Sequence, residues 1–414
     1  MMLQNSIRLA KKNSQVNYIV MLLLIFKSIE VTYLALSPIT TVVFLLYVFF
    51  HFNNRKLKID LFFYRFTLIY FFILFIYLVQ FGSIDFFLSS YIYIKFLYAY
   101  LSVKVIGVKF FTYFEDIVYK GALISIPFFI LQILFYEQTL YLVSFLQKNI
   151  SFFAYNNDDH YSMFIFSIQT RGGELRNSGF AWEPKGFANF LALAILINLV
   201  RNEFKLMNKK LLILTIALIT TFSTTGYLMV FICYSIFIFS NTKFRDKLII
   251  IPFILALFAI VLQQEFITDK ILYEFETKGG YEDVLYTERD DREAFSLGRV
   301  GSFIVDFEDF KKKPIIGYGM QRSERTQHRW VKLVRVNGLS DIFTTFGSIG
   351  LMFFLYTYWS FYDKLLKSKK MKGRFILMLS TLICFFASNL ISHPFWMSMY
   401  FVFLIPFEKN NKLL

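Results

Sequence analysis

The sequence predicts an all-α polytopic membrane protein with about twelve transmembrane helices and two long outer loops. Of the 414 residues, 57% are hydrophobic and 21% are aromatic, whereas only 18% are charged. The mean hydropathy is +0.53, and a soluble protein of this size could not bury so many apolar side chains. Apolar stretches of roughly 15–22 residues recur along the chain, and this is close to the length that crosses a bilayer.

Each apolar stretch is expected to form one helix of a single integral membrane domain, residues 1–414. The expected spans are about 17–36, 37–52, 60–80, 88–110, 114–136, 186–201, 210–222, 226–240, 248–263, 339–359, 373–390 and 393–408.

The basic residues predict the orientation of these spans. Lys and Arg cluster in the connections at 55–58, 201–210, 243–247 and 364–374, whereas the short turns near 35–38, 81–87, 223–225 and 391–393 contain none. Because short cytoplasmic connections are enriched in Lys and Arg, both termini are expected in the cytoplasm. The same distribution accounts for much of the net charge of +15, so a nucleic-acid partner is not expected.

Two long segments then lie on the outer side, at 137–185 and 264–338. In the first, the stretch 140–153 is too short and interrupted for a span, so it is expected to lie along the membrane interface. In the second, apolar residues recur at helical spacing and predict an amphipathic helix that rests on lipid or on the helix bundle. These residues are Leu297, Val300, Phe303, Ile304, Phe307 and Phe310.

Neither a cofactor nor a metal ion is expected. The sequence contains no P-loop, no GxGxxG and no metal signature, and both cysteines, Cys233 and Cys384, lie inside apolar runs. Buried single cysteines of this kind are typical of a packed core.

A first candidate site is the sequence LRNSGFAWEP (175–184), where a central span begins. Arg176 beside a helix N-terminus is typical of an anion site, because a planar cation and free N–H groups both face the ligand. Glu183 is either a helix-start residue that complements the helix dipole or a catalytic base. Trp182 suits membrane anchoring and contact with a sugar ring.

Two further segments carry polar residues on the same outer side. The sequence SLGRVGSFIVDFEDFKKKPIIGYGM (296–320) places Arg299 at the start of the amphipathic helix, where the dipole disfavours a cation. Asn337 and Asp341 stand at the entry of the span that follows. The glycines of that span, Gly347 and Gly350, are also explained by close helix packing alone.

Together the three segments resemble the O-antigen polymerase and O-antigen ligase family of bacterial envelope polysaccharide enzymes. The family's pattern is an Arg-x-x-Gly…Pro span entry, then an Arg-led helix ending in Pro-x-x-Gly-x-Gly. An Asn-led span entry follows, with Gly-x-x-Gly ten residues on. The matching residues are Arg176, Gly179 and Pro184; Arg299, Pro314, Gly317 and Gly319; and Asn337, Gly347 and Gly350.

The resemblance implies metal-independent glycosyl transfer on the outer face of the bacterial cytoplasmic membrane, in O-antigen, capsule or exopolysaccharide synthesis. The donor would be a glycan on undecaprenyl diphosphate and the acceptor a new lipid-linked repeat unit. The expected partners are undecaprenyl-diphosphate-linked oligosaccharide, membrane lipid, a chain-length regulator and a flippase.

Cations near the leaving diphosphate would lower the barrier to this transfer. The residues expected to be catalytic are Arg176, Glu183, Arg299 and His328, and those expected to bind substrate are Asn337, Asp341, Arg289, Arg335, Trp182, Gly317 and Gly319. The acceptor base is left open among Glu183, His328 and Asp341.

The ligase branch of the family usually carries a histidine directly before the asparagine. This chain has Val336 there, which favours polymerase over ligase. The other alternative is a flippase or transporter of lipid-linked oligosaccharide, since ionisable residues lie inside several expected spans, among them Lys27, Arg65, Lys95 and Lys120.

Overall fold

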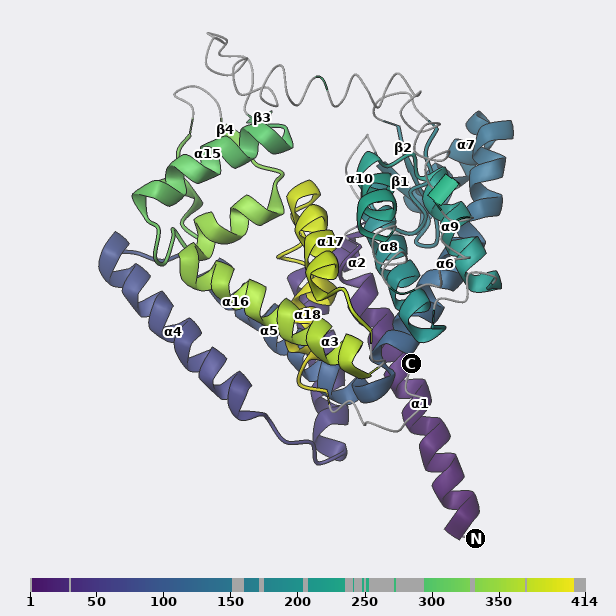
Figure 1. Ribbon diagram of the computed structural model, residues 1–414, viewed down its shortest axis with the longest axis horizontal. Coiled ribbons are helices and arrows are strands. Elements are labelled where there is room, and N and C mark those ends of the chain that lie inside the picture. The colour runs from purple at the N-terminus through teal and green to yellow at the C-terminus, as the bar shows by residue number, and fades with distance from the viewer. Residues whose placement is uncertain are drawn as a thin grey trace.

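The computed structural model shows a mostly helical chain in which two short β-pairs lie at one end (Figure 1). It describes residues 2–29, 31–150, 160–170, 175–203, 208–234, 241, 248, 251–252, 272, 294–327, 332–368 and 371–405.

The N-terminal half contains eight α-helices, one 3-10 turn and one strand pair among its described residues. They are α1 (Met2–Phe26), α2 (Tyr33–Leu36), α3 (Pro38–Asn54), α4 (Leu61–Phe81), α5 (Phe86–Ile106), η1 (Gly107–Lys109), α6 (Phe110–Leu134), α7 (Tyr136–Asn149), β1 (His160–Ser162), β2 (Ser167–Gln169) and α8 (Pro184–Arg201).

The remaining elements follow in the same order along the chain. They are α9 (Lys209–Thr220), α10 (Thr224–Leu228), the π-helical turn η2 (Met229–Tyr234), β3 (Ala294–Ser296), α15 (Arg299–Lys312), η3 (Arg322–Glu324), β4 (Lys332–Val334), α16 (Gly338–Ser368), α17 (Arg374–Ala387) and α18 (Pro394–Val402).

Within the described residues, four helical stretches are long and apolar enough to cross a membrane: α4, Phe86–Leu134, α8 and Gly338–Lys367. The second stretch is divided by η1 into α5 and α6. Shorter apolar helices are Asn13–Phe26, α3 and α17. A helical, membrane-embedded protein is therefore supported, while the full number of about twelve spans stays a prediction.

The spans differ in how deeply they are buried. In α8, 89% of the apolar window is buried inside the protein, whereas in α4 only 17% is buried. Thus α8 is enclosed by other parts of the protein, whereas α4 stands at the edge of the bundle with many of its apolar side chains exposed (Figure 1). A helix whose outer faces are this apolar is suited to contact with lipid tails.

The expected span 17–36 is interrupted. Helix α1 ends at Phe26 and the short α2 begins only at Tyr33. The buried Lys27 explains the break, because its Nζ donates to Ser37 O at 2.9 Å and to Ala35 O, carbonyl groups at the end of α2. The stretch 140–153 also differs from expectation in extent, since α7 begins at Tyr136 and ends at Asn149.

The amphipathic helix expected after Leu297 is confirmed as α15, which packs against α16. Phe303, Phe307 and Phe310 all lie around the ring of Phe343, with ring centroids 5.1–6.4 Å apart. Of the two surfaces expected to receive this helix, α15 therefore rests on the bundle. It ends at Lys312, and its C-cap Lys313 directly precedes Pro314, as expected for a helix followed by proline.

Helix α16 is broken at Gly347, which has φ 63° and ψ −164°. The break leaves backbone groups of α16 without partners in their own helix, and the segment Pro314–Gly319 forms hydrogen bonds with them. Tyr318 N and Gly319 N donate to the carbonyls of residues 344 and 345. In return, the N–H groups of residues 348 and 349 donate to the carbonyls of residues 314 and 315. A broken helix is tolerated at membrane depth only when its backbone is satisfied in this way.

The glycines of this segment are required by close packing. A Cβ atom on Gly317 would lie 2.4 Å from Thr344 O, and one on Gly347 would lie 2.2 Å from Ile315 O. A Cβ on Gly319 would lie 2.6 Å from the ring of Tyr77. Gly317 and Gly319, which were predicted to bind substrate, thus have a packing role in the structure, and the predicted ligand contact stays a prediction.

The strand pairs and α15 lie at the end of the molecule away from the N-terminus (Figure 1). Strands β1 and β2 pair antiparallel, with Tyr161 opposite Ile168, and β3 pairs parallel with β4, with Phe295 opposite Leu333. The candidate site residues are placed by the elements at this end.

Candidate active site

A cluster of buried charges joins α15 to the start of α16. Arg335 Nη1 lies 2.6 Å from Asp306 Oδ1, and Arg335 Nη2 lies 2.9 Å from Asp309 Oδ2. Both carboxylates belong to the buried face of α15, three residues apart. Ser340 and Thr326 complete the cluster by donating to Asp306 and Asp309, respectively. Arg335 was predicted to bind substrate, but here it clamps α15 to the bundle.

Burial raises the pKa of Asp306 to about 6, even though Arg335 acts in the opposite direction. The nearby Asp341 carboxylate contributes to the increase. Since the ordinary value is 3.8, the folded protein binds more protons than the unfolded chain between pH about 4 and 6. The free energy of unfolding therefore contains a contribution from Asp306 that is complete below this window and is lost as the pH rises through it.

Asp306→Asn is expected to remove this pH dependence, because an amide stays neutral at every pH of the window. The contribution lost by the wild type between pH 4 and 6.5 is on the order of 2–3 kcal/mol. The measurement is the thermal unfolding midpoint of both proteins across this range. Relative to the variant, the wild type should lose stability as the pH rises. If the unfolding midpoints of the two proteins change in parallel with pH, Asp306 does not have the raised pKa assigned to it.

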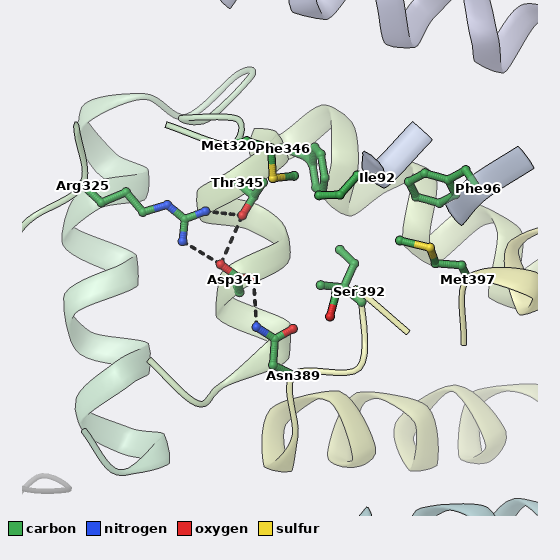
Figure 2. Close-up of a pocket in the computed structure, with 11 residues that line it drawn as sticks. Ile92, Phe96, Met320, Arg325, Asp341, Thr345, Phe346, Asn389, Ser392 and Met397 are labelled. Carbon is green, nitrogen blue, oxygen red and sulfur yellow. Dashed lines mark hydrogen bonds and ion pairs between the residues drawn. The ribbon is translucent and has the colours of Figure 1, made fainter. Parts of the chain in front are cut away.

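A second buried ion pair lies next to this cluster and lines a small polar niche (Figure 2). Arg325 Nη1 lies 2.6 Å from Asp341 Oδ1, and Arg325 also donates to Thr345 Oγ1. Burial alone would lower the pKa of Arg325, but the carboxylates of Asp341, Asp306 and Asp309 together outweigh burial and raise it. The niche therefore holds a permanent cation against the Asp341 carboxylate.

Asn389, from the α17–α18 connection, completes the ion-pair network. Its Nδ2 donates to Asp341 Oδ2 at 3.1 Å, and Figure 2 shows its oxygen turned toward Ser392. Among the described residues, Asn389 Oδ1 is a buried atom without a hydrogen-bond partner. The niche has a volume of about 40 Å³, and its other walls are apolar side chains such as Phe96 and Phe346.

A much larger apolar groove lies beside the niche, between α4 and α16. Its volume is about 440 Å³, within the range of pockets that bind ligands. The groove and the niche share the side chains of Phe96, Phe346 and Ile391. On α16 its lining begins at Ile342, next to Asp341, and continues down one face of the helix to Tyr356. The hollow is therefore lined mainly by apolar side chains, with Arg65 of α4 also in its wall, and it adjoins the polar niche at the Asp341 end.

Arg299 and Asn337 lie against each other at the start of α15 and α16. Asn337 Nδ2 donates to Arg299 O at 3.2 Å, and its Oδ1 accepts from Ser340 N in the first turn of α16. Arg299 Nε donates to Ala387 O at 3.2 Å, two residues before Asn389. Asn337 is fully buried with both polar groups bonded to the protein, so its contact with substrate stays a prediction.

Glu183 also lies near Arg299. Burial alone would raise the pKa of Glu183, but Lys185, Trp182 and Arg299 outweigh burial and lower it below its ordinary value of 4.5. Lys185 Nζ is 3.1 Å from Glu183 Oε1. The Trp182 ring stacks on His393 with centroids 5.2 Å apart. Lys185, Arg299 and Glu183 thus form a group of two cations and one carboxylate near the first turns of α8, α15 and α18. The N-terminus of a helix favours anions.

Arg176 has a structural role that the sequence did not suggest. Its Nε donates to Thr221 O at 3.2 Å and its Nη2 to Phe222 O at 2.8 Å. These carbonyls follow the last turn of α9, where a cation complements the helix dipole. The predicted role of Arg176 at a diphosphate stays a prediction.

Two of the predicted site residues, His328 and Arg289, lie outside the described residues. The sequence patterns did not single out Arg325, Thr345, Asn389, Asp306 or Asp309 as site residues. No short-range signal could have found Asn389, since it meets Asp341 across 48 residues. Among the described residues, no group of three His, Cys, Asp or Glu side chains could hold a metal ion.

Comparison of the chain with protein-family models, with curated proteins and with solved structures gives no match.

Proposed function

We propose that the chain is a membrane glycosyltransferase that polymerises lipid-linked oligosaccharide repeat units. The observation that carries this proposal is the apolar groove between α4 and α16, which ends at the polar niche around Asp341. A hollow with this division suits a ligand that has a long hydrocarbon chain and a polar head. An undecaprenyl-diphosphate-linked glycan is such a ligand.

In the proposed reaction, a hydroxyl of the acceptor unit attacks the anomeric carbon of the sugar that carries the diphosphate. The new glycosidic bond forms as the bond from that carbon to the phosphate oxygen breaks. Negative charge develops on the departing lipid diphosphate, and the proton of the hydroxyl passes to a base. A preformed cation lowers the barrier most where this charge develops.

Arg299 is the cation that we assign to the leaving diphosphate. It stands at the N-terminus of α15, and its charge acts together with Lys185 and the first turn of α8. Glu183 is the described carboxylate beside this group, and it is ionised at neutral pH because Lys185, Trp182 and Arg299 lower its pKa. We therefore assign Glu183 as the acceptor base.

The polymerase assignment rests on Val336, which replaces the histidine of the ligase branch. A transporter is less well supported, because several ionisable groups inside the spans have local partners. Lys95 Nζ donates to Ser392 O at 3.0 Å, and Lys120 pairs with Asp116 at 2.9 Å. Lys27 binds the carbonyls that end α2. Such pairs stabilise the bundle without a translocated substrate.

Ile349→Trp is expected to impair polymerisation about tenfold or more, because the indole would occupy the groove that α16 lines. Excluding two or three methylene groups of a lipid tail, at about 0.8 kcal/mol each, is sufficient for this loss. The matched control is Met352→Trp. Met352 is 60% exposed and does not line the groove.

The measurement is the length distribution and yield of polymer made by the two variants at equal amounts of folded protein. Equal polymer from Ile349→Trp and Met352→Trp would show that the groove does not hold the substrate, and would remove the observation on which the proposal rests.

A further inference from the structure

We propose that the niche is a sugar subsite, in which Asn389 recognises a hydroxyl group of the sugar that carries the diphosphate. This inference rests on the proposed function and deepens it. It assigns a specificity role to a residue in the α17–α18 connection.

The orientation of the Asn389 side chain is fixed by its neighbour. A carboxylate next to an arginine accepts hydrogen bonds and cannot donate one, so the Asn389 amide must turn its nitrogen to Asp341. The amide oxygen then faces the other way, toward Ser392 (Figure 2). Because this oxygen is buried without a donor among the described residues, a ligand that supplies a donor removes an unfavourable state.

The polar atoms around the niche include acceptors and donors. Asn389 Oδ1 is an acceptor and Arg325 Nε is a buried N–H, and neither has a hydrogen-bond partner among the described residues. The Nη atoms of Arg325 are directed to Asp341 and Thr345, and the backbone oxygen of Ser392 accepts from Lys95. A hydroxyl group both donates and accepts, so neighbouring hydroxyls match this set.

The size and walls of the niche also fit the edge of a sugar ring. A space of about 40 Å³ accommodates roughly two or three water-sized groups. It is therefore large enough for neighbouring hydroxyls and too small for a complete sugar. Phe96 and Phe346 supply apolar surface for the C–H groups of the ring. Apolar walls with a few fixed polar atoms are typical of specific ligand sites.

The position of the niche identifies which sugar it receives. The niche adjoins the lipid groove through Phe96, Phe346 and Ile391, so the sugar nearest to the lipid reaches it first. Arg299 binds Ala387 at the start of the same connection. For a sugar held at Asn389, the Asp341 carboxylate would stabilise positive charge on the ring as the bond to phosphate breaks.

The test compares ligand binding by the full-length protein in lipid nanodiscs. The probes are farnesyl diphosphate and a panel of farnesyl diphosphates that carry glucose, galactose, N-acetylglucosamine or N-acetylgalactosamine. We expect the wild type to bind at least one sugar-bearing probe more tightly than farnesyl diphosphate. Asn389→Ala should weaken binding of that probe about tenfold, as expected for one lost hydrogen bond with its buried partner, and leave farnesyl diphosphate unchanged.

The matched control is Asn202→Ala, which removes a comparable hydrogen bond, from Asn202 Nδ2 to Asn198 O, at the other end of α8. It should change neither affinity. Thermal unfolding midpoints establish that each variant is folded. If Asn389→Ala is not folded, Met320→Phe fills the niche from its partly exposed wall and should produce the same selective loss.

Three results would overturn the inference. The first is a wild type that binds every sugar-bearing probe no more tightly than farnesyl diphosphate. The second is an equal loss of affinity for both kinds of probe in Asn389→Ala, which would indicate a general structural effect. The third is selective binding that neither niche variant changes. A wild type that binds none of the probes would instead contradict the proposed function itself.

Discussion

Replacing Arg299 with alanine is expected to reduce chain growth about a hundredfold or more while the protein remains folded. The reason is that a fixed cation at the leaving group acts mainly in the transition state, and removing one such donor typically costs about 10²–10³ in rate. Arg299→Lys should retain part of the activity, because it keeps the charge but lacks the planar fork that binds two phosphate oxygens at once.

Lys311→Ala is the matched control, since it removes a cation from the same helix. Lys311 pairs with Glu308 on the exposed face of α15, where both side chains are 54% exposed, and such pairs contribute little to stability. Polymer yield is measured per amount of folded protein in membranes. A folded Arg299→Ala protein that makes polymer of normal length and yield would exclude Arg299 from catalysis.

Arg335→Ala is expected to have the largest effect on stability, about 3–5 kcal/mol. The substitution leaves the carboxylates of Asp306 and Asp309, both fully buried, without their shared cation. Removing one partner of a buried ion pair is costly because the remaining charge cannot be hydrated. We expect α15 to detach from α16 before the spans unfold, since the rest of its contact surface consists mainly of aromatic rings around Phe343.

Hydrogen exchange followed by mass spectrometry measures this detachment directly. Peptides from α15 should lose protection in Arg335→Ala, while peptides from α8 should keep it. Lys367→Ala is the control, because it breaks an exposed ion pair with Asp363 and should alter neither region. Unchanged protection of α15 in Arg335→Ala would mean that the buried charges do not hold this helix.

Local patterns in the sequence were sufficient to predict those elements whose structure depends on neighbouring residues. The amphipathic periodicity from Val300 to Phe310 predicted α15, and the Lys-Pro sequence that follows it predicted its end. The helix begins at Arg299 and ends at Lys312.

Features that depend on distant contacts could not be predicted. Gly347 in the expected span suggested close helix packing. The break in α16 at this glycine, however, is explained only by the backbone hydrogen bonds that the segment Pro314–Gly319 makes with it. The interruption at Lys27 likewise depends on carbonyls at the end of α2. Hydropathy reports the apolar character of a segment and contains no information about which backbone groups are paired by another segment.

The candidate site was predicted in part. The sequence indicated Arg299, Asn337 and Asp341, and the structure places Asn337 against Arg299 and Asp341 in the polar niche. It did not indicate Asn389, because an asparagine in a short turn between two spans resembles many turn residues. The buried ion pairs of Arg325 and Arg335 were not predicted either, since an arginine in a charged loop is as compatible with solvent as with a buried carboxylate.

The most direct test of the proposed polymerase is reconstitution of the purified protein in liposomes with lipid-linked repeat units. The units are isolated from producing cells that lack this chain, and Arg299→Ala serves as the inactive control. We predict that the wild type converts the units into a ladder of products that grows by one repeat at a time and releases undecaprenyl diphosphate. A single transfer to lipid A core, or movement of the units across the bilayer without any new glycosidic bond, would contradict the proposal.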